Sequence, residues 1–107
     1  MTTSKPHKLI FFKKENCEPC KKAAEELWEV LKVYPEFHPY VVELQKENHQ
    51  ALVVSYNLEM YPTVLIMDQN QQELSRKVGV RFLTKEWWQA ALTAIHQHHK
   101  NDDAPSV

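Results

Sequence analysis

Two cysteines, Cys17 and Cys20, lie where a short apolar strand gives way to a helical sequence, and they are the only cysteines in the chain. The preceding segment 7–12 is rich in β-favouring residues with almost no polar alternation, as in a strand buried on both faces. After Cys20, apolar residues recur every three or four positions as far as Tyr34, which predicts an amphipathic helix that Pro35 ends. A strand that runs directly into a helix begins a parallel crossover unit.

The rest of the sequence continues this alternation. The predicted strands are residues 40–44, 63–67 and 73–78, and the predicted helices are residues 47–56 and a last helix that Thr84 caps. The order strand, helix, strand, helix, strand, strand, helix gives a parallel pair followed by an antiparallel hairpin. We therefore expect an α/β fold with a four-stranded mixed sheet and helices on both faces.

The composition indicates a single globular domain. At 107 residues, with 43% hydrophobic and 25% charged residues, the chain can bury a core without a metal or a structural disulfide. We expect the domain to span residues 1–99 and residues 100–107 to form a disordered tail. The net charge of −1 gives no electrostatic basis for binding nucleic acid or a membrane surface. The single glycine excludes the glycine-rich phosphate loops of nucleotide-binding proteins.

The N-terminal segment gives an expectation about location. Residues 1–8 lead into an apolar stretch that is too short for the core of a signal peptide, and no small-residue cleavage site follows it. No apolar run in the chain approaches membrane-spanning length. We therefore expect a cytoplasmic protein, and no feature of the sequence demands an oligomer, so we expect a monomer.

The two thiols occupy different positions on the predicted helix. Cys20 falls on the buried stripe, whereas Cys17 lies at the exposed helix start, where the positive end of the macrodipole favours a thiolate. In thiol–disulfide exchange, Cys17 would attack a partner's disulfide and Cys20 would then resolve the mixed disulfide. The carboxylate of Glu18 opposes the activation of Cys17, while the neighbouring lysines favour it.

Four segments of the chain resemble the thioredoxin family: Cys17-Glu18-Pro19-Cys20, Tyr56-Asn57-Leu58, Tyr61-Pro62-Thr63 and Lys77-Val78-Gly79. The first matches the family's Cys-x-Pro-Cys, the third its loop with a cis-proline that faces the cysteines, and the last its glycine beside the active site. The resemblance covers about residues 8–95 and implies a thioredoxin-like fold with thiol–disulfide oxidoreductase activity, most simply as a protein disulfide reductase.

The chain also departs from the family's pattern. Asn16 replaces the usual tryptophan before the first cysteine, and Glu18 replaces a glycine inside the motif. Phe11 stands where the family has a buried aspartate that handles the proton of the second cysteine, so Glu18 or water would have to take that proton. About eight residues precede the first strand, so the sequence resembles an atypical, short member that lacks the family's first strand and helix.

The resemblance also implies the site and its partners. The dithiol itself carries the electrons, so we expect no bound cofactor and no metal. The expected partners are protein disulfide substrates and an upstream reductase. The implied site residues are the catalytic pair Cys17 and Cys20, the substrate-binding residues Tyr61, Pro62, Gly79 and Asn16, and Glu18, which tunes the thiol pKa.

Two other functions stay open at this point. Cys17 and Cys20 are also half of a possible metal site, although Pro19 and the strand-to-helix context argue against an open loop of soft ligands. The histidines near the end of the last helix add no clear ligand cluster. The other alternative is a redox-silent interaction module that binds partners through Tyr61 and Pro62.

Overall fold

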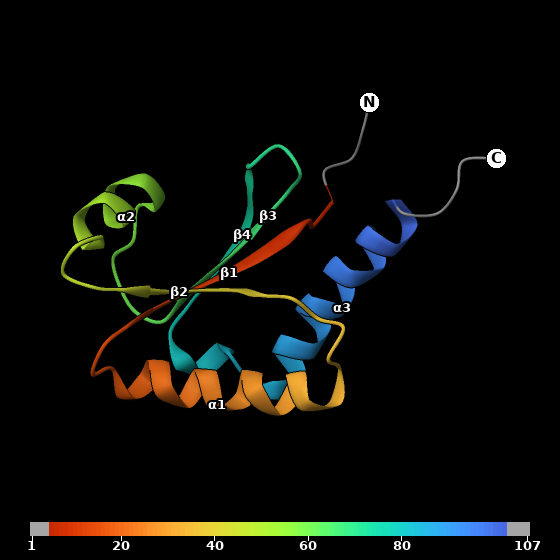
Figure 1. The fold of residues 1–107 in the computed structure, drawn as a ribbon, viewed down its shortest axis with the longest axis horizontal. Coiled ribbons are helices and arrows are strands. Elements are labelled where there is room, and N and C mark those ends of the chain that lie inside the picture. The colour runs from red at the N-terminus through yellow and green to blue at the C-terminus, as the bar shows by residue number, and fades with distance from the viewer. Residues whose placement is uncertain (1–4, 103–107) are drawn as a thin grey trace.

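The computed structural model describes the backbone of residues 5–102 and the side chains of residues 5–98. Figure 1 shows the arrangement of the elements. In chain order they are β1 (Lys8–Lys14), α1 (Glu18–Val33), β2 (Tyr40–Leu44), α2 (His49–Tyr56), β3 (Thr63–Met67), β4 (Glu73–Val78), the single 3₁₀ turn η1 (Val80–Phe82) and α3 (Lys85–Asp102).

The predicted strands 40–44, 63–67 and 73–78 are confirmed at both ends. The first strand runs two residues further than expected, to Lys14, and η1 was not predicted. Helix α3 continues through Asp102, so residues 100–102, which the sequence assigned to a tail, are helical. The rest of the predicted tail lies outside the described residues. Between residues 5 and 102, no helix is both long and apolar enough to span a membrane.

The sheet has the strand order β2-β1-β3-β4. Strands β1 and β2 are parallel because α1 crosses over between them, whereas β3 is antiparallel to both β1 and β4. This is the mixed four-stranded sheet that the sequence predicts. Strand β4 is an edge strand, also as predicted, and β2 forms the other edge.

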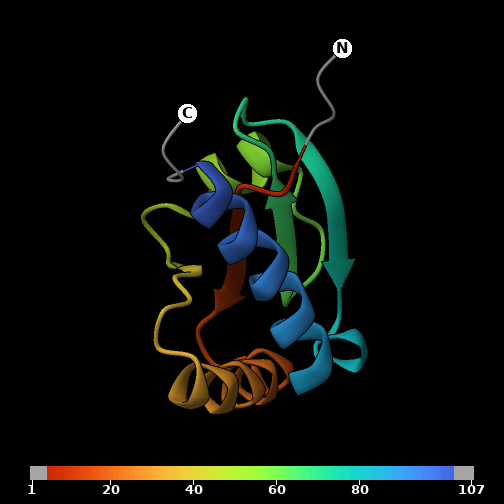
Figure 2. The ribbon, with the colours of Figure 1, turned by 90° about the vertical axis from the view of Figure 1, so that its right-hand side faces the viewer.

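Each face of the sheet has its own core, and Figures 1 and 2 show α1 and α3 on one side with α2 on the other. Successive side chains of a strand point to opposite faces. Phe11 therefore packs with α1 and α3, and Phe12 packs in the core on the α2 side. Both side chains are at most 1% exposed. This double burial explains why the first strand shows no polar alternation in the sequence.

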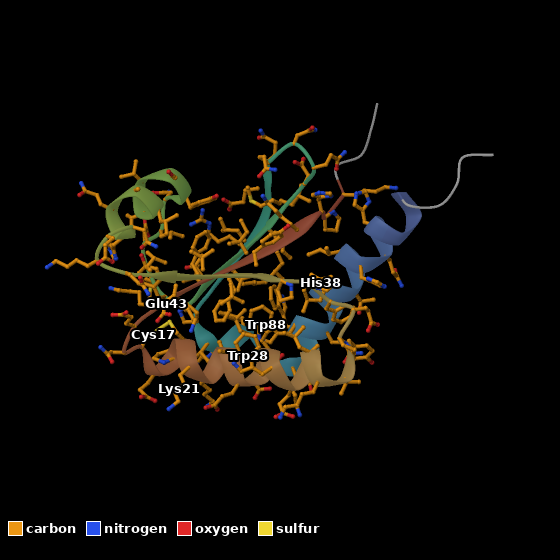
Figure 3. The ribbon with its side chains drawn as sticks, viewed as in Figure 1. Cys17, Lys21, Trp28, His38, Glu43 and Trp88 are labelled. Atoms are coloured by element: carbon orange, nitrogen blue, oxygen red, sulfur yellow. A yellow bond between two sulfur atoms is a disulfide. The ribbon has the colours of Figure 1, made fainter. Side chains whose placement is uncertain are left out.

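Trp88 joins α3 to both α1 and the sheet. Its indole N–H donates to the backbone carbonyl of Ala23 on α1 at 3.2 Å, and its ring meets Phe11 edge-on, with centroids 5.2 Å apart. Figure 3 shows Trp88 lying close to α1, inside the molecule. A buried indole needs a partner for its N–H, and α1 supplies it. The helix that carries both cysteines is thereby fixed against the rest of the fold.

Candidate active site

Cys17 begins α1 as its N-cap residue. Its backbone is extended, with φ −114° and ψ 104°, and its sulfur accepts a hydrogen bond from the backbone N–H of Cys20 at 3.2 Å. The first N–H groups of a helix have no partner within the helix, so this contact satisfies one of them. Pro19 carries no N–H and therefore suits this first turn. The helix start and the thiol pair are thus one structural unit.

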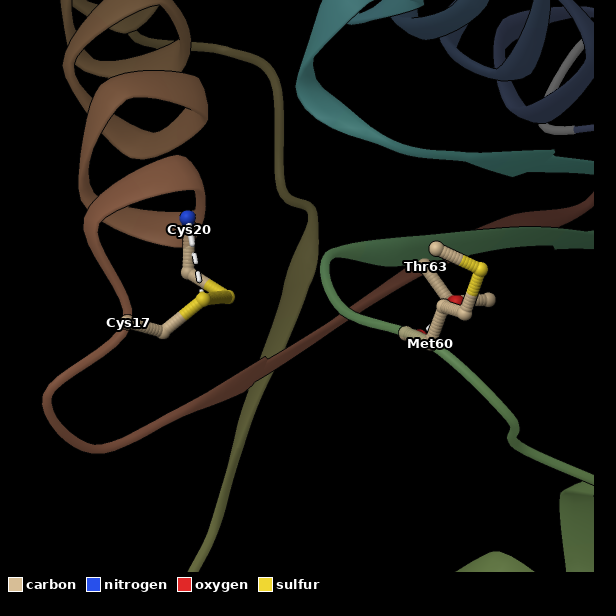
Figure 4. Close-up of a disulfide and its surroundings, with 4 residues drawn as sticks. All are labelled: Cys17, Cys20, Met60 and Thr63. Carbon is tan, nitrogen blue, oxygen red and sulfur yellow. Dashed lines mark hydrogen bonds between the residues drawn. A yellow bond between two sulfur atoms is a disulfide. The ribbon is translucent and has the colours of Figure 1, made fainter.

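The sulfur atoms of Cys17 and Cys20 are joined in a disulfide, and the two Cα atoms are 5.2 Å apart. Figure 4 shows the bond at the first turn of α1. Cys20 is 1% exposed, as its place on the apolar stripe predicts. Cys17 is partly buried rather than fully exposed, because its sulfur is turned toward Cys20. Cys17 is nevertheless the more exposed residue of the pair.

Asn16 holds a left-handed backbone conformation, with φ 55°, immediately before Cys17. Asparagine is one of the few residues that adopts this conformation readily. It allows the chain to leave β1 and turn into α1 within a few residues. The structure therefore gives Asn16 a backbone role that the sequence did not predict, and a substrate contact by this exposed side chain stays a prediction.

Three loops meet at one end of the sheet, beyond the ends of the three neighbouring strands β1, β3 and β4. Phe12, two residues before the end of β1, pairs with Thr63 at the start of β3, and Thr63 pairs in turn with Val78 at the end of β4. The segments just beyond these residues lead to Cys17, Pro62 and Gly79 respectively. Figure 4 shows the turn between Met60 and Thr63 bending toward the disulfide. The register therefore brings the separate parts of the predicted site together.

Pro62 is buried, and the Tyr61–Pro62 peptide bond is cis, as predicted. The N–H of Gly79 donates to the carbonyl of Pro62 at 2.9 Å. Gly79 itself has φ 95° and ψ 147°, a conformation that is essentially restricted to glycine. No atom lies within 4 Å of the position that a Cβ would occupy there. The glycine is therefore needed for its backbone, and the space beside it leaves room for another chain.

The side chain of Tyr61 packs against the core on the α2 side. The Lys14 ammonium lies 5.0 Å from the centre of its ring. Its hydroxyl is buried and has no hydrogen-bond partner within the described part of the chain. Burial raises the pKa of Tyr61, so the hydroxyl stays neutral at physiological pH. Because this side chain packs against the core, we expect any pairing of Tyr61 with a substrate to use its backbone, and that pairing stays a prediction.

Several residues at this end of the sheet were not found from the sequence. The Thr63 hydroxyl donates to the carbonyl of Met60 at 2.6 Å and so fastens the turn that contains Pro62. Met60 itself is 61% exposed. On the other side, Phe82 of η1 is 53% exposed, and the Lys77 ammonium lies 5.8 Å from its ring centre. An aromatic residue three positions after a predicted site glycine is the one sequence signal that could have singled out Phe82.

Glu18, predicted to tune the thiol pKa, and Phe11, which stands in place of the family's aspartate, differ in their surroundings. Glu18 is exposed in the first turn of α1, where a carboxylate also complements the macrodipole. Phe11 is fully buried against Trp88 in the core between the sheet and the two longer helices. No group of three or more His, Cys, Asp or Glu side chains between residues 5 and 98 is placed to hold a metal ion.

Comparison with known proteins adds three findings. A family model described as "Thioredoxin-like domain" matches residues 1–95. No match to the chain was found among curated proteins. Several solved structures share the fold. A thioredoxin-like protein from Clostridium perfringens superimposes with a TM-score of 0.67 at 20% identity, covering 88% of this chain and 74% of that one.

Two further structures agree. Thioredoxin-2 of the malaria parasite gives a TM-score of 0.63 at 17% identity, covering 87% of this chain and 86% of that one. The thioredoxin of Malassezia sympodialis gives 0.63 at 20% identity, covering 89% and 79% of the two chains. At these identities the likeness concerns the fold alone.

Proposed function

This chain belongs to the thioredoxin-like domain family, and on that premise we propose that it is a thiol–disulfide oxidoreductase that reduces disulfides in partner proteins. The observation that carries the proposal is the Cys17–Cys20 disulfide at the N-terminus of α1, between one partly exposed and one buried cysteine. A structural disulfide is not needed to stabilise a domain of this size, so the pair is better explained by redox chemistry.

The proposed cycle starts from the dithiol. The Cys17 thiolate attacks one sulfur of the partner's disulfide, which forms a mixed disulfide and releases one partner thiolate. Cys20 then loses its proton, and its thiolate attacks the sulfur of Cys17. The Cys17–Cys20 disulfide forms and the second partner thiolate leaves, so two electrons have passed to the partner. An upstream dithiol reductase returns two electrons to the pair.

The fold supports each role. The helix N-terminus stabilises the Cys17 thiolate through the macrodipole and the unpaired N–H groups of the first turn. Burial of Cys20 disfavours its thiolate until the mixed disulfide has formed. Since Phe11 offers no carboxylate, the proton of Cys20 goes to Glu18 or to water.

The loop that contains Pro62 is the proposed docking site for the substrate. In this proposal Pro62 presents no N–H toward the sulfurs, and the backbone of Tyr61 pairs with an extended segment of the substrate, as in strand addition. Asn16 and Gly79 would flank that segment. We place the protein in the cytoplasm, where reducing conditions would keep the pair available as the dithiol, and we expect it to act as a monomer.

The reduction potential of the Cys17–Cys20 pair tests the proposal. The protein would be equilibrated with glutathione or dithiothreitol buffers and its free thiols counted. A value near about −270 mV, that of thioredoxin, supports a reductase. A value between roughly −120 and −200 mV would instead indicate an oxidant or isomerase. Failure of the two thiols to form a disulfide at all would exclude the redox function.

A further inference from the structure

Arg76, on the edge strand β4, binds the end of α2. Its Nη1 donates to the carbonyl of Asn57 at 2.9 Å, and its Nη2 donates to the carbonyl of Tyr56 at 2.7 Å. Asn57 is the left-handed C-cap residue of α2, with φ 53°. The last carbonyls of a helix have no partner within it, so an arginine from across the sheet satisfies them here.

A carboxylate fixes the orientation of this arginine. Glu73 accepts hydrogen bonds from Nε and Nη2 of Arg76 at 3.0 and 2.8 Å. The hydrogen bond from Arg76 lowers the pKa of Glu73, so the carboxylate stays ionised well below neutral pH. Because the guanidinium is planar and this contact is bidentate, the two N–H groups that face α2 are held in a defined direction.

The loop 57–62 leads from α2 to β3 and forms part of the candidate site. Strand β4 and the residue after it hold this loop at both of its ends. Arg76 binds it at Asn57, and Gly79, which directly follows the last residue of β4, binds the carbonyl of Pro62. Because a strand has a fixed rise per residue, these two attachments set the span of the loop.

An open groove lies between the loop and β4. It has a volume of about 720 Å³, and Arg76, Asn57, Met60 and Val78 are among the residues that line it. The loop is therefore not packed tightly onto β4 along this side. Leu58 anchors the start of the loop in the core on the α2 side, and on the side of the groove the hydrogen bonds from Arg76 attach it to β4.

We propose that Arg76 is a positioning residue for protein substrates. It holds the loop 57–62 so that the Tyr61 backbone is in place to pair with an extended segment whose disulfide reaches Cys17. The inference rests on the proposed oxidoreductase function. A small disulfide needs only access to Cys17, so its reduction does not depend on Arg76.

The test compares two substrates. Reduction of insulin and of the small aromatic disulfide dithiobis(nitrobenzoate) would be measured for the full chain and for Arg76→Gln, Arg76→Lys and Glu73→Gln. We expect Arg76→Gln to raise the KM for insulin about tenfold, which corresponds to about 1.4 kcal/mol, with no change in the rate for the small disulfide or in the reduction potential. Arg76→Lys should be intermediate, because a point charge cannot reach both carbonyls and Glu73 together.

Two variants serve as controls. Glu73→Gln weakens the contact that orients Arg76 but leaves the arginine able to reach the carbonyls, so it should raise the KM for insulin less than Arg76→Gln does. Lys32→Gln removes the other i,i+3 ion pair, Glu29–Lys32, from the exposed surface of α1 and should change nothing. If Arg76→Gln fails to fold, the two substrates are compared with Arg76→Lys instead.

Distinct outcomes would overturn the inference. Unchanged insulin kinetics in both Arg76 variants would show that the loop does not need the arginine. Equal losses with both substrates, or a shifted potential, would show a general structural role instead. If the unsubstituted chain reduces neither substrate, the proposed function itself is refuted. That result is obtained before any variant is compared, so it is distinct from a failure of the inference about Arg76.

Discussion

The backbone N–H of Gly79 donates to the carbonyl oxygen of Pro62 at 2.9 Å, which joins the end of β4 to the loop that leads into β3. Both residues were predicted as parts of one site from motifs that lie far apart in the sequence. The hydrogen bond depends on a backbone conformation at Gly79 that other residues rarely adopt. It therefore links the only glycine of the chain directly to the geometry of the site.

Gly79→Ala should destabilise the protein by about 1–3 kcal/mol. The cause is the backbone conformation alone, since the added Cβ would meet no atom within 4 Å. Urea unfolding measures the loss, with a substitution of the exposed Ser75 on the preceding strand β4, Ser75→Ala, as the control. Equal unfolding midpoints for Gly79→Ala and the parent protein would contradict this explanation.

Substitutions of Asn16 should separate its backbone role from a substrate contact. Asn16→Ala should cost about 1–2 kcal/mol of stability, because alanine tolerates the left-handed conformation poorly, whereas Asn16→Gly should cost little. We expect Asn16→Gly to lower the rate of insulin reduction while its stability is retained, because the amide is lost from the substrate surface. A normal rate in that variant would leave Asn16 with the backbone role only.

The two cysteines should behave differently when each is replaced. Cys20→Ser should accumulate a mixed disulfide with a substrate, because Cys17 can still attack and nothing resolves the product. Cys17→Ser should form little, since the remaining thiol is buried. Non-reducing electrophoresis and mass spectrometry measure the adducts. Equal trapping by both variants would argue against Cys17 as the attacking residue.

Phe11→Asp tests whether the absence of a carboxylate at position 11 limits the rate at which Cys20 loses its proton. We expect a loss of about 3 kcal/mol or more, because a large buried ring is removed and a carboxylate takes its place. Among the molecules that still fold, the turnover should rise, since a carboxylate at this position would accept the proton of Cys20. Phe11→Leu controls for the lost packing, and a turnover no higher than in that control would mean that the missing base does not limit the rate.

The Glu73–Arg76 pair should make a pH-dependent contribution to stability. The pKa of Glu73 is lowered in the folded protein, so its contribution is complete above the unfolded value of about 4.3 and is lost as the pH falls through the lower folded value. The unfolding free energy of Glu73→Gln should lie below that of the parent by less than about 1 kcal/mol at pH 7, because both partners are substantially exposed. Urea titrations at several pH values should show this gap closing only below about pH 4. A gap that widened on acidification would contradict the assignment.

The sequence predicted three of the strands to the residue because polar or turn-forming segments bound them. It placed the start of α2 too early, at residue 47. Asn48 is the reason, since its side chain accepts a hydrogen bond from the N–H of Gln45 at 2.8 Å and so forms a turn before the helix. The turn η1 is too short to show any periodicity, so no sequence pattern could indicate it.

Local motifs in the sequence were enough to indicate several residues that lie near one another in the structure, although their roles stay predictions. Cys17 and Cys20 lie within one helical turn, and Pro62 and Gly79 each lie at the end of a predicted strand. The bonds from Arg76 to the end of α2 could not be predicted, because they join residues 19 and 20 positions apart and depend on which strand lies beside the loop. Likewise, the Thr63–Met60 bond depends on a turn conformation that the residue types alone do not specify.

Strand β1 is hydrogen-bonded to a neighbour on each side and is covered on both faces, with Leu9, Ile10, Phe11 and Phe12 all at most 5% exposed. Its amides should therefore exchange with solvent deuterium only when the whole domain unfolds. Cys17 follows this strand after a two-residue turn, whereas the loop 57–62 is tied to an edge strand that opens more readily. The sulfur atoms are therefore attached to the part of the molecule that should open last.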